Sequence, residues 1–155
     1  MNPTLHDDDR LIIDKTASSF AHLQGKQYTP SRGDIIVVND SSDGGATGAA
    51  GGQLIKRVIG LPGERVVVEN GVITVFNDEF PGGFNADEQL QLRLDPTFSL
   101  QRVEAVLGSN EVFVTGDNRG PGGSFDSRVF GPIDVNTIEG RLWARIFPLT
   151  DVRIF

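Results

Sequence analysis

Lys56 has apolar sequence neighbours, which are typical of a buried, reactive lysine rather than of a surface charge. Lys56 follows the apolar pair Leu54-Ile55 and precedes, after one arginine, the β-branched pair Val58-Ile59. Burial among apolar neighbours disfavours the ammonium form and lowers a lysine pKa, so that the neutral amine can accept a proton as a general base. A strand-end lysine whose charged tip reaches water explains the same pattern without chemistry. Lys56 is therefore a candidate base that needs support from other segments.

A second polar segment follows the apolar run 112–114. It opens with Gly116-Asp117-Asn118-Arg119 and continues through Ser124, Asp126 and Arg128. Arginine and carboxylate side chains pair through bidentate hydrogen bonds that hold a fixed geometry. We therefore expect the charged residues of this segment to form ion pairs that support a site without performing its chemistry. Ser124, taken alone, is an ordinary turn serine after two glycines.

The two histidines do not offer a better base than Lys56. His6 and His22 both lie in polar stretches. A serine hydroxyl is a weak nucleophile until a base takes its proton, so a Ser-His-Asp triad is poorly supported here. A Ser-Lys dyad is a recognised variant of that triad, and Lys56 fits the base of such a dyad.

Four blocks of this sequence together resemble the type I signal peptidases, which are membrane-bound serine endopeptidases that remove signal peptides from exported proteins. They follow the family's order from one end of the chain to the other, at residues 1–5, 32–38, 56–63 and 116–131. As a set they are far more specific than any single motif. The resemblance implies a Ser/Lys dyad and cleavage after small residues, the Ala-x-Ala pattern of signal peptides.

The resemblance also implies individual roles. Lys56 is the implied general base and Ser124 the residue that orients it. Ser127 is the alternative, because the stretch before Ser124 is longer than in many relatives. The implied substrate-binding residues are Met1, Pro3, Leu5, Leu54 and Ile55, of which Leu5, Leu54 and Ile55 fit a core position equally well. The implied structural supports are Arg57, Gly116, Asp117, Asn118, Arg119, Asp126 and Arg128.

The nucleophile is expected outside the printed sequence. In the family, a catalytic serine directly precedes the residue that aligns with Met1, and a membrane anchor lies further upstream. We therefore expect the serine immediately before Met1, with its backbone N–H in the oxyanion hole. The chain as printed is expected to be inactive because that serine is missing from it. It is expected to be a truncated soluble domain, since no window approaches the roughly 20 apolar residues that span a bilayer. The native protein is expected on the extracytoplasmic face of a bacterial cytoplasmic membrane.

Composition narrows the remaining classes. The 155 residues fit one domain, and the net charge of −7 argues against nucleic-acid binding. The absence of cysteine excludes disulfides, thiolate metal sites and a cysteine nucleophile. We expect no metal and no organic cofactor. The expected partners are signal peptides of secreted preproteins and a lipid surface, the latter through Phe80, Phe84 and Phe98, and the expected state is a monomer.

Many short β-forming runs separated by turns predict an all-β domain with very little helix. Expected strands lie at 11–13, 35–38, 111–115 and 138–146, the last with Trp143 packing and Gly140 at a close approach. A further strand carries Lys56 and ends at the turn 61–63. Asn70-Gly71 predicts the turn of a hairpin over 66–75, and the glycine-rich stretch 40–52 predicts a flexible loop. Residues 16–31 are expected to be irregular. The resemblance implies mainly antiparallel coiled sheets, with a core of 1–76 and 108–155 and a small cap at 77–107.

Three other interpretations stay open at this point. The chain can be a non-cleaving homologue that binds signal peptides or membrane partners. It can be another Ser/Lys peptidase, such as a self-cleaving repressor, although Gly116–Arg119 and Lys56-Arg57 favour the signal peptidases. It can also be a β-rich interaction domain, which leaves the four ordered blocks unexplained.

Overall fold

The computed structural model describes residues 1–25, 27–39 and 52–155, so the loop expected at 40–52 lies almost wholly outside the described residues. The strands are β1 Arg10–Asp14, β2 Ile35–Asn39, β3 Gln53–Gly60, β4 Arg65–Glu69, β5 Val72–Phe76, β6 Phe84–Asn85, β7 Val103–Val106, β8 Glu111–Thr115, β9 Ile133–Asp134, β10 Ile138–Phe147 and β11 Arg153–Ile154. The helices are α1 Thr16–Leu23, α2 Ala86–Gln89 and α3 Ser127–Phe130, with 3-10 turns η1 Val135–Thr137 and η2 Leu149–Asp151.

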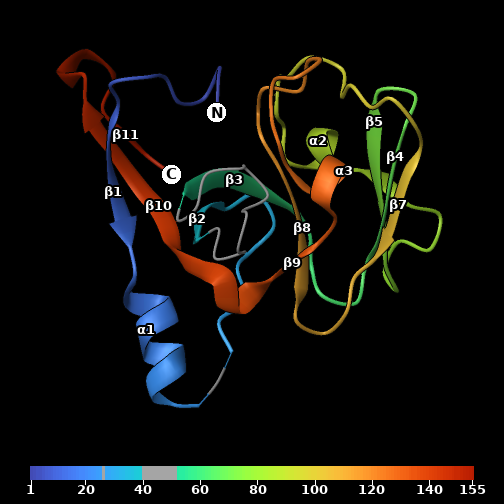
Figure 1. Ribbon diagram of the computed structural model, residues 1–155, viewed down its shortest axis with the longest axis horizontal. Coiled ribbons are helices and arrows are strands. Elements are labelled where there is room, and N and C mark those ends of the chain that lie inside the picture. The colour runs from blue at the N-terminus through green and yellow to red at the C-terminus, as the bar shows by residue number, and fades with distance from the viewer. Residues whose placement is uncertain (26, 40–51) are drawn as a thin grey trace.

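The strands form two antiparallel sheets. The larger has the order β1-β10-β2-β3-β8-β9, with β11 also paired to β10, and the smaller has the order β6-β5-β4-β7. Figure 1 shows the two sheets as neighbouring halves, with α1 beside the larger sheet. The prediction of an all-β, mainly antiparallel domain is confirmed.

The hairpin predicted around Asn70-Gly71 is β4–β5. Val68 pairs with Ile73 and Glu69 with Val72, which leaves Asn70 and Gly71 as the two turn residues. Their φ angles are 52° and 83°, the positive values that a two-residue turn of this kind requires.

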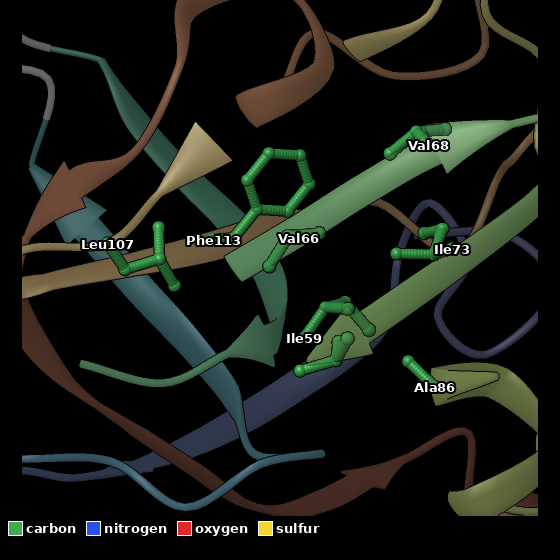
Figure 2. Packing of buried hydrophobic residues seen from close by; sticks show 8 residues of the cluster. Ile59, Val66, Val68, Ile73, Ala86, Leu107 and Phe113 are labelled. Atoms are coloured by element: carbon green, nitrogen blue, oxygen red, sulfur yellow. The ribbon is translucent and has the colours of Figure 1, made fainter. Parts of the chain in front are cut away.

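The two sheets share one hydrophobic core. Ile59 from β3 and Phe113 from β8 pack with Val66 and Val68 of β4, and the cluster is completed by Ile73, Val75, Ala86 and Leu107. Figure 2 shows these side chains meeting between strands of both sheets. Burial of such apolar side chains is the main force that joins the sheets.

The larger sheet is covered on both faces, which explains why β2 reads as a continuous apolar run. Ile36 and Val38 pack into a cluster with Val58 and Val114. Ile35 points to the opposite face, into a cluster with Leu5 and Leu142. The prediction of a buried strand at 35–38 is confirmed.

Two local expectations were wrong and a third is confirmed. Residues 16–31 are not wholly irregular, because α1 spans Thr16–Leu23; its serines and threonine have modest helix propensity. The Asp14 carboxylate accepts the Thr16 backbone N–H at 2.8 Å at the start of this helix. Trp143, which was expected to pack, leaves 44% of its surface exposed. Gly140 does stand at a close approach, since a Cβ there would lie 2.7 Å from the Asp14 carbonyl oxygen.

The predicted cap is tied to the smaller sheet. Within 77–107, β6 pairs with β5 and β7 pairs with β4, and the short helix α2 starts at Ala86. The division into a core and a cap stays a prediction. Among the described residues, no helix has the length and apolar character needed to cross a membrane.

Gly60 offers a test of the packing between the sheets. A Cβ at this position would lie 2.6 Å from Val66 Cγ2 and 2.7 Å from Leu107 Cδ1. We expect Gly60→Ala to lower the free energy of unfolding by about 1–3 kcal/mol, because overpacking displaces core side chains. Urea unfolding measures the change. Gly82→Ala is the control, since its Cβ would meet nothing within 4 Å, and an equal loss in both variants would contradict the explanation.

Candidate active site

Lys56 lies in β3 directly opposite Ile36 of β2. Paired residues of neighbouring strands present their side chains on the same face, and Ile36 belongs to the cluster that includes Val58 and Val114. The lysine is partly buried there. The expectation of apolar surroundings for Lys56 is therefore met by packing across strands, and not only by its sequence neighbours.

Burial lowers the pKa of the Lys56 amine from its ordinary value. The Asp126 carboxylate opposes this shift, and the Arg128 guanidinium adds to it. Desolvation is the largest of the three effects, as expected for a cation removed from water. The site therefore favours a neutral amine more than water does.

The first five residues form a turn that is fixed to the same region. The backbone N–H groups of Thr4 and Leu5 donate to the Met1 carbonyl at 2.9 and 3.0 Å. Leu5 is buried with Met1 packed against its cluster. The Thr4 hydroxyl donates to the Asp117 carboxylate, and Arg145 Nη1 donates to the Thr4 carbonyl at 3.0 Å. Sequence reasoning missed Thr4 and Arg145, because their partners lie more than a hundred positions away.

The amine of Met1 lies within electrostatic reach of Lys56. Its pKa is lowered, first by desolvation and then by the positive charge of Lys56. Thus the turn 1–5 brings the start of this sequence next to the candidate base. The family resemblance implies this neighbourhood, since it puts the serine partner of Lys56 directly before Met1, whereas no local sequence pattern joins the two segments.

Arg57 and Asp117 form a buried bidentate ion pair. Arg57 Nε and Nη2 donate to the two Asp117 carboxylate oxygens at 2.8 and 2.6 Å. Arg57 Nη1 also donates to the Gly33 carbonyl at 2.8 Å. The pair joins the strand of Lys56 to the segment 116–119, and through Thr4 to the turn 1–5.

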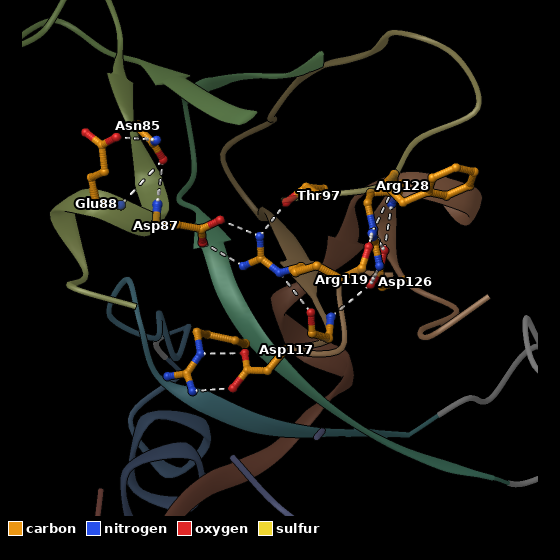
Figure 3. A network of polar contacts seen from close by, with 11 residues as sticks. Asn85, Asp87, Glu88, Thr97, Asp117, Arg119, Asp126 and Arg128 are labelled. Atoms are coloured by element: carbon orange, nitrogen blue, oxygen red, sulfur yellow. Dashed lines mark hydrogen bonds and ion pairs between the residues drawn. The ribbon is translucent and has the colours of Figure 1, made fainter. Parts of the chain in front are cut away.

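Gly116, Ser124 and Asp126 meet at close quarters. The Gly116 N–H donates to Asp126 Oδ2 at 2.8 Å, and Arg128 Nε and Nη2 donate to the same carboxylate, both at 2.8 Å (Figure 3). A Cβ on Gly116 would lie 2.3 Å from Ser124 Oγ, so only glycine permits this approach. These hydrogen bonds lower the pKa of Asp126 against the opposing effect of its burial, and Asp126 stays ionised.

Ser124 and Ser127 differ in what their hydroxyls contact. Among the described residues, Ser124 Oγ is buried without a hydrogen bond of ordinary geometry, although it lies near enough to Asp126 to help lower that carboxyl pKa. Ser127 Oγ accepts the Val114 backbone N–H at 3.0 Å. The Ser127 hydroxyl is therefore engaged with the backbone, whereas the Ser124 hydroxyl is available for the role of orienting Lys56, which stays a prediction.

Arg119 pairs outside its own segment. It is fully buried, and its guanidinium donates to both oxygens of Asp87, at 2.6 and 2.7 Å (Figure 3). The expected ion pairs among Asp117, Arg119, Asp126 and Arg128 are therefore only partly local, since Asp126–Arg128 is the one formed within that group. Asp87 was missed because nothing in its local sequence distinguishes it from a helix-capping acid.

The remaining predicted residues lie around this centre. Pro3 is exposed and lines a hollow with Arg57 and Leu142, while Leu54 and Ile55 are partly buried on β3. Asn118 is exposed and contacts the backbone near Gly123, where a Cβ would clash with its amide. Their implied roles in binding and support stay predictions.

One edge of β3 is open beside Lys56. Residues 53–56 pair with β2 on one side. On the other side β8 pairs with β3 only from Arg57 onward, and no other described strand continues that pairing. Unpaired backbone groups on a strand edge are a template for an additional strand.

Comparisons with known proteins agree with the class that the sequence motifs indicate. A sequence model of the family described as "Signal peptidase, peptidase S26" matches residues 1–147. The chain is 38% identical to "Probable signal peptidase I-1" of Synechocystis over 149 residues, which is 96% of this chain and 67% of that protein. It is 32% identical to the signal peptidase I of Bacillus amyloliquefaciens over 157 residues, 99% of this chain and 72% of that one.

A crystal structure of a signal peptidase I from Enterococcus faecalis is also similar, with 26% identity and a TM-score of 0.49, covering 76% of this chain and 99% of that chain. Because the family model matches residues 1–147, the comparison shows that this chain is of the protease class of hydrolases. The chain belongs to the signal peptidase family, peptidase S26.

The Arg57–Asp117 pair supplies a test of how the site is held. We expect Asp117→Asn to lower the free energy of unfolding by about 3–5 kcal/mol, because it leaves the buried guanidinium uncompensated. The control is Glu104→Gln, which removes the same charge from exposed ion pairs with Arg65 and Arg102 and is expected to cost under about 1 kcal/mol. Chemical denaturation of both variants measures the free energy of unfolding. Similar losses in the two variants would contradict a stabilising role for the buried Arg57–Asp117 pair.

Proposed function

We propose that this chain is the catalytic domain of a type I signal peptidase that cleaves signal peptides from exported preproteins through a Ser/Lys dyad. The observation that carries the proposal is the partly buried Lys56, with a lowered pKa, beside the turn that begins with Met1. The nucleophile is the serine expected immediately before Met1. Lys56 is the general base, and Ser124 orients its amine.

The proposed reaction begins with a neutral Lys56. The serine oxygen attacks the carbonyl carbon of the scissile peptide while Lys56 Nζ takes the hydroxyl proton. The serine's own backbone N–H stabilises the developing oxyanion. The lysine then gives its proton to the leaving amine, which frees the mature protein and leaves an acyl-enzyme. Water hydrolyses the ester, again with Lys56 as the base, and restores the serine.

The open edge of β3 supports a binding mode for the substrate. An extended peptide that adds to residues 53–56 would place its backbone alongside the strand that carries Lys56. Leu54, Ile55, Met1 and Leu5 are the proposed apolar lining for small side chains, although Leu5 is also part of the core. The proposed preference for Ala-x-Ala sites is assigned to this lining.

The proposal predicts that a chain extended by the upstream serine cleaves a peptide with an Ala-x-Ala site. Cleavage is expected to rise with pH as Lys56 loses its proton, with a midpoint below the ordinary lysine pKa because burial lowers it. Lys56→Met in the extended chain is expected to lower kcat by about 100-fold or more. Chromatography of the cleavage products measures both effects.

The 155-residue form is one control, expected to be inactive, and Lys15→Met, at an exposed position, is another, expected to leave kcat unchanged. Cleavage that does not depend on Lys56 would exclude the dyad mechanism. Failure of the extended chain to cleave would favour a non-cleaving signal-peptide binder.

We also propose contact with a lipid surface through exposed apolar side chains. Phe80 and Phe98 are 39% and 40% exposed, whereas Phe84 packs against the core cluster and is a weaker candidate. Ile12 and Trp143, which line one hollow beside β1, together with Ile146 and Phe147 add a larger exposed apolar set on β1 and β10. The apolar surface of this sheet is the stronger candidate for lipid contact.

Trp143, the single tryptophan of the chain, reports on this contact directly. We expect its fluorescence emission to shift to shorter wavelength when phosphatidylethanolamine–phosphatidylglycerol vesicles are added, because the indole leaves water. Trp143→Phe with Phe98→Trp moves the probe to the cap and distinguishes the two surfaces. Unchanged emission in both proteins, with no co-sedimentation, would exclude lipid contact by this domain.

A further inference from the structure

Arg119 extends from the segment 116–119 into the predicted cap. Its Nη1 and Nη2 atoms donate to Asp87 Oδ2 and Oδ1 at 2.6 and 2.7 Å, and Nη1 also donates to Thr97 Oγ1 at 2.8 Å. Figure 3 shows the guanidinium joined by hydrogen bonds to the side chains of these two cap residues. The Arg119 side chain is fully buried, whereas the Asp87 side chain is 18% exposed. The cap therefore supplies the only carboxylate that neutralises this cation among the described residues.

The other donor of Arg119 holds the backbone at Gly116. Arg119 Nε donates to the Gly116 carbonyl at 3.0 Å, and the Arg119 carbonyl accepts from Arg128 Nη1 at 3.1 Å. The Gly116 N–H is held separately by Asp126 at 2.8 Å. The Gly116 residue is thus fixed through its N–H and its carbonyl, by Asp126 and by Arg119 respectively.

The placement of Gly116 decides where Ser124 can lie. The closeness of Ser124 Oγ to the Gly116 Cα leaves no room for even a methyl group. The Asp126 carboxylate and the Arg128 guanidinium act electrostatically on Lys56, and in the 155-residue chain Lys56 and the Met1 amine also lie within electrostatic reach of each other. A shift of Gly116 and Arg128 would therefore change both the position of the orienting serine and the solvation of the lysine.

We propose that Asp87 is a positioning residue for peptide cleavage, which acts through Arg119 on Gly116, Ser124 and Arg128. The inference rests on the proposed function, and it gives the cap a role in catalysis rather than only in packing. Without the carboxylate, a buried guanidinium lacks its counter-charge and moves toward water. Its bonds to Gly116 and Thr97 are then lost, and the turn beside Lys56 loosens.

The decisive variant is Asp87→Asn in the chain extended by the upstream serine. We expect kcat to fall by about 10- to 100-fold, since a small misplacement of a reacting group has this effect. KM should change by less than about threefold, because the open edge of β3 is untouched. The acid limb of the pH–rate profile should move to higher pH, because water admitted near Lys56 raises its pKa toward the ordinary value.

Glu88→Gln is the matched control, with the same charge change at the next residue of α2. Glu88 is exposed and accepts from Asn85 Nδ2, so its kcat and pH profile should stay within about twofold of the unsubstituted chain. If Asp87 has only a structural role, Asp87→Asn lowers the melting temperature and leaves the pH profile of the folded fraction unchanged.

A second measurement does not depend on activity. An amine-selective reagent applied to the 155-residue chain over a range of pH, with mass spectrometry of the Lys56 peptide, gives the pH of half-maximal reaction at Lys56. This pH should be higher in Asp87→Asn than in the unsubstituted chain, and unchanged in Glu88→Gln. If the extended chain fails to cleave, the proposed function fails, while this measurement still decides the role of Asp87.

The proposal would be overturned if Asp87→Asn folds and its pH of half-maximal reaction at Lys56 (the Lys56 midpoint) is unchanged. It would also be overturned if kcat of this variant stays within twofold of the unsubstituted chain. If Asp87→Asn does not fold, Thr97→Val takes its place, since it removes one hydrogen bond to Arg119 and keeps the carboxylate. We expect a fall in kcat of about threefold and a smaller rise of the Lys56 midpoint. No change in either quantity would overturn the proposal.

Discussion

Three buried arginine–carboxylate pairs hold the surroundings of Lys56, and the rest of the site depends on them. Arg57–Asp117 and Arg119–Asp87 join β3 and the predicted cap to the loop that follows β8, whereas Arg128–Asp126 lies within the segment after that strand. A charge removed from water is costly unless its partner is in place with good geometry. The two long-range pairs therefore fix two segments each in one relative position, and the local pair fixes the turn that carries Asp126.

This arrangement also explains why no carboxylate fully neutralises the positive charge of Lys56. The carboxylates near Lys56 are already committed to arginines, so that Asp126 is shared with Arg128 and the Gly116 N–H rather than given to the lysine. Burial then dominates, and the lysine pKa falls. A free carboxylate in the same place would have stabilised the ammonium form and removed the base.

The apolar packing provides the frame for these pairs. Ile59 and Phe113 belong to the core that joins the two sheets, and both lie on the strands that lead into the polar segments. Ile36 and Val58 cover the face on which Lys56 lies. The N-terminal turn is added to this frame by Leu5 and by the Thr4–Asp117 hydrogen bond, so the start of the sequence is held by groups from three other parts of the chain.

The sequence by itself determined the fold class, the hairpin at Asn70-Gly71 and the buried strand at 35–38. It also singled out Lys56 as the candidate general base. These follow from local signals, namely β-branched runs, turn residues and a lysine among apolar neighbours. It did not reveal α1, whose residues have modest helix propensity, nor the exposure of Trp143. Only the tertiary structure decided which carboxylate each arginine meets, because the partners lie 60 positions apart for Arg57–Asp117 and 32 for Arg119–Asp87. Long-range pairing of buried charges leaves no local pattern, since each residue's partner is set by strand order and loop path.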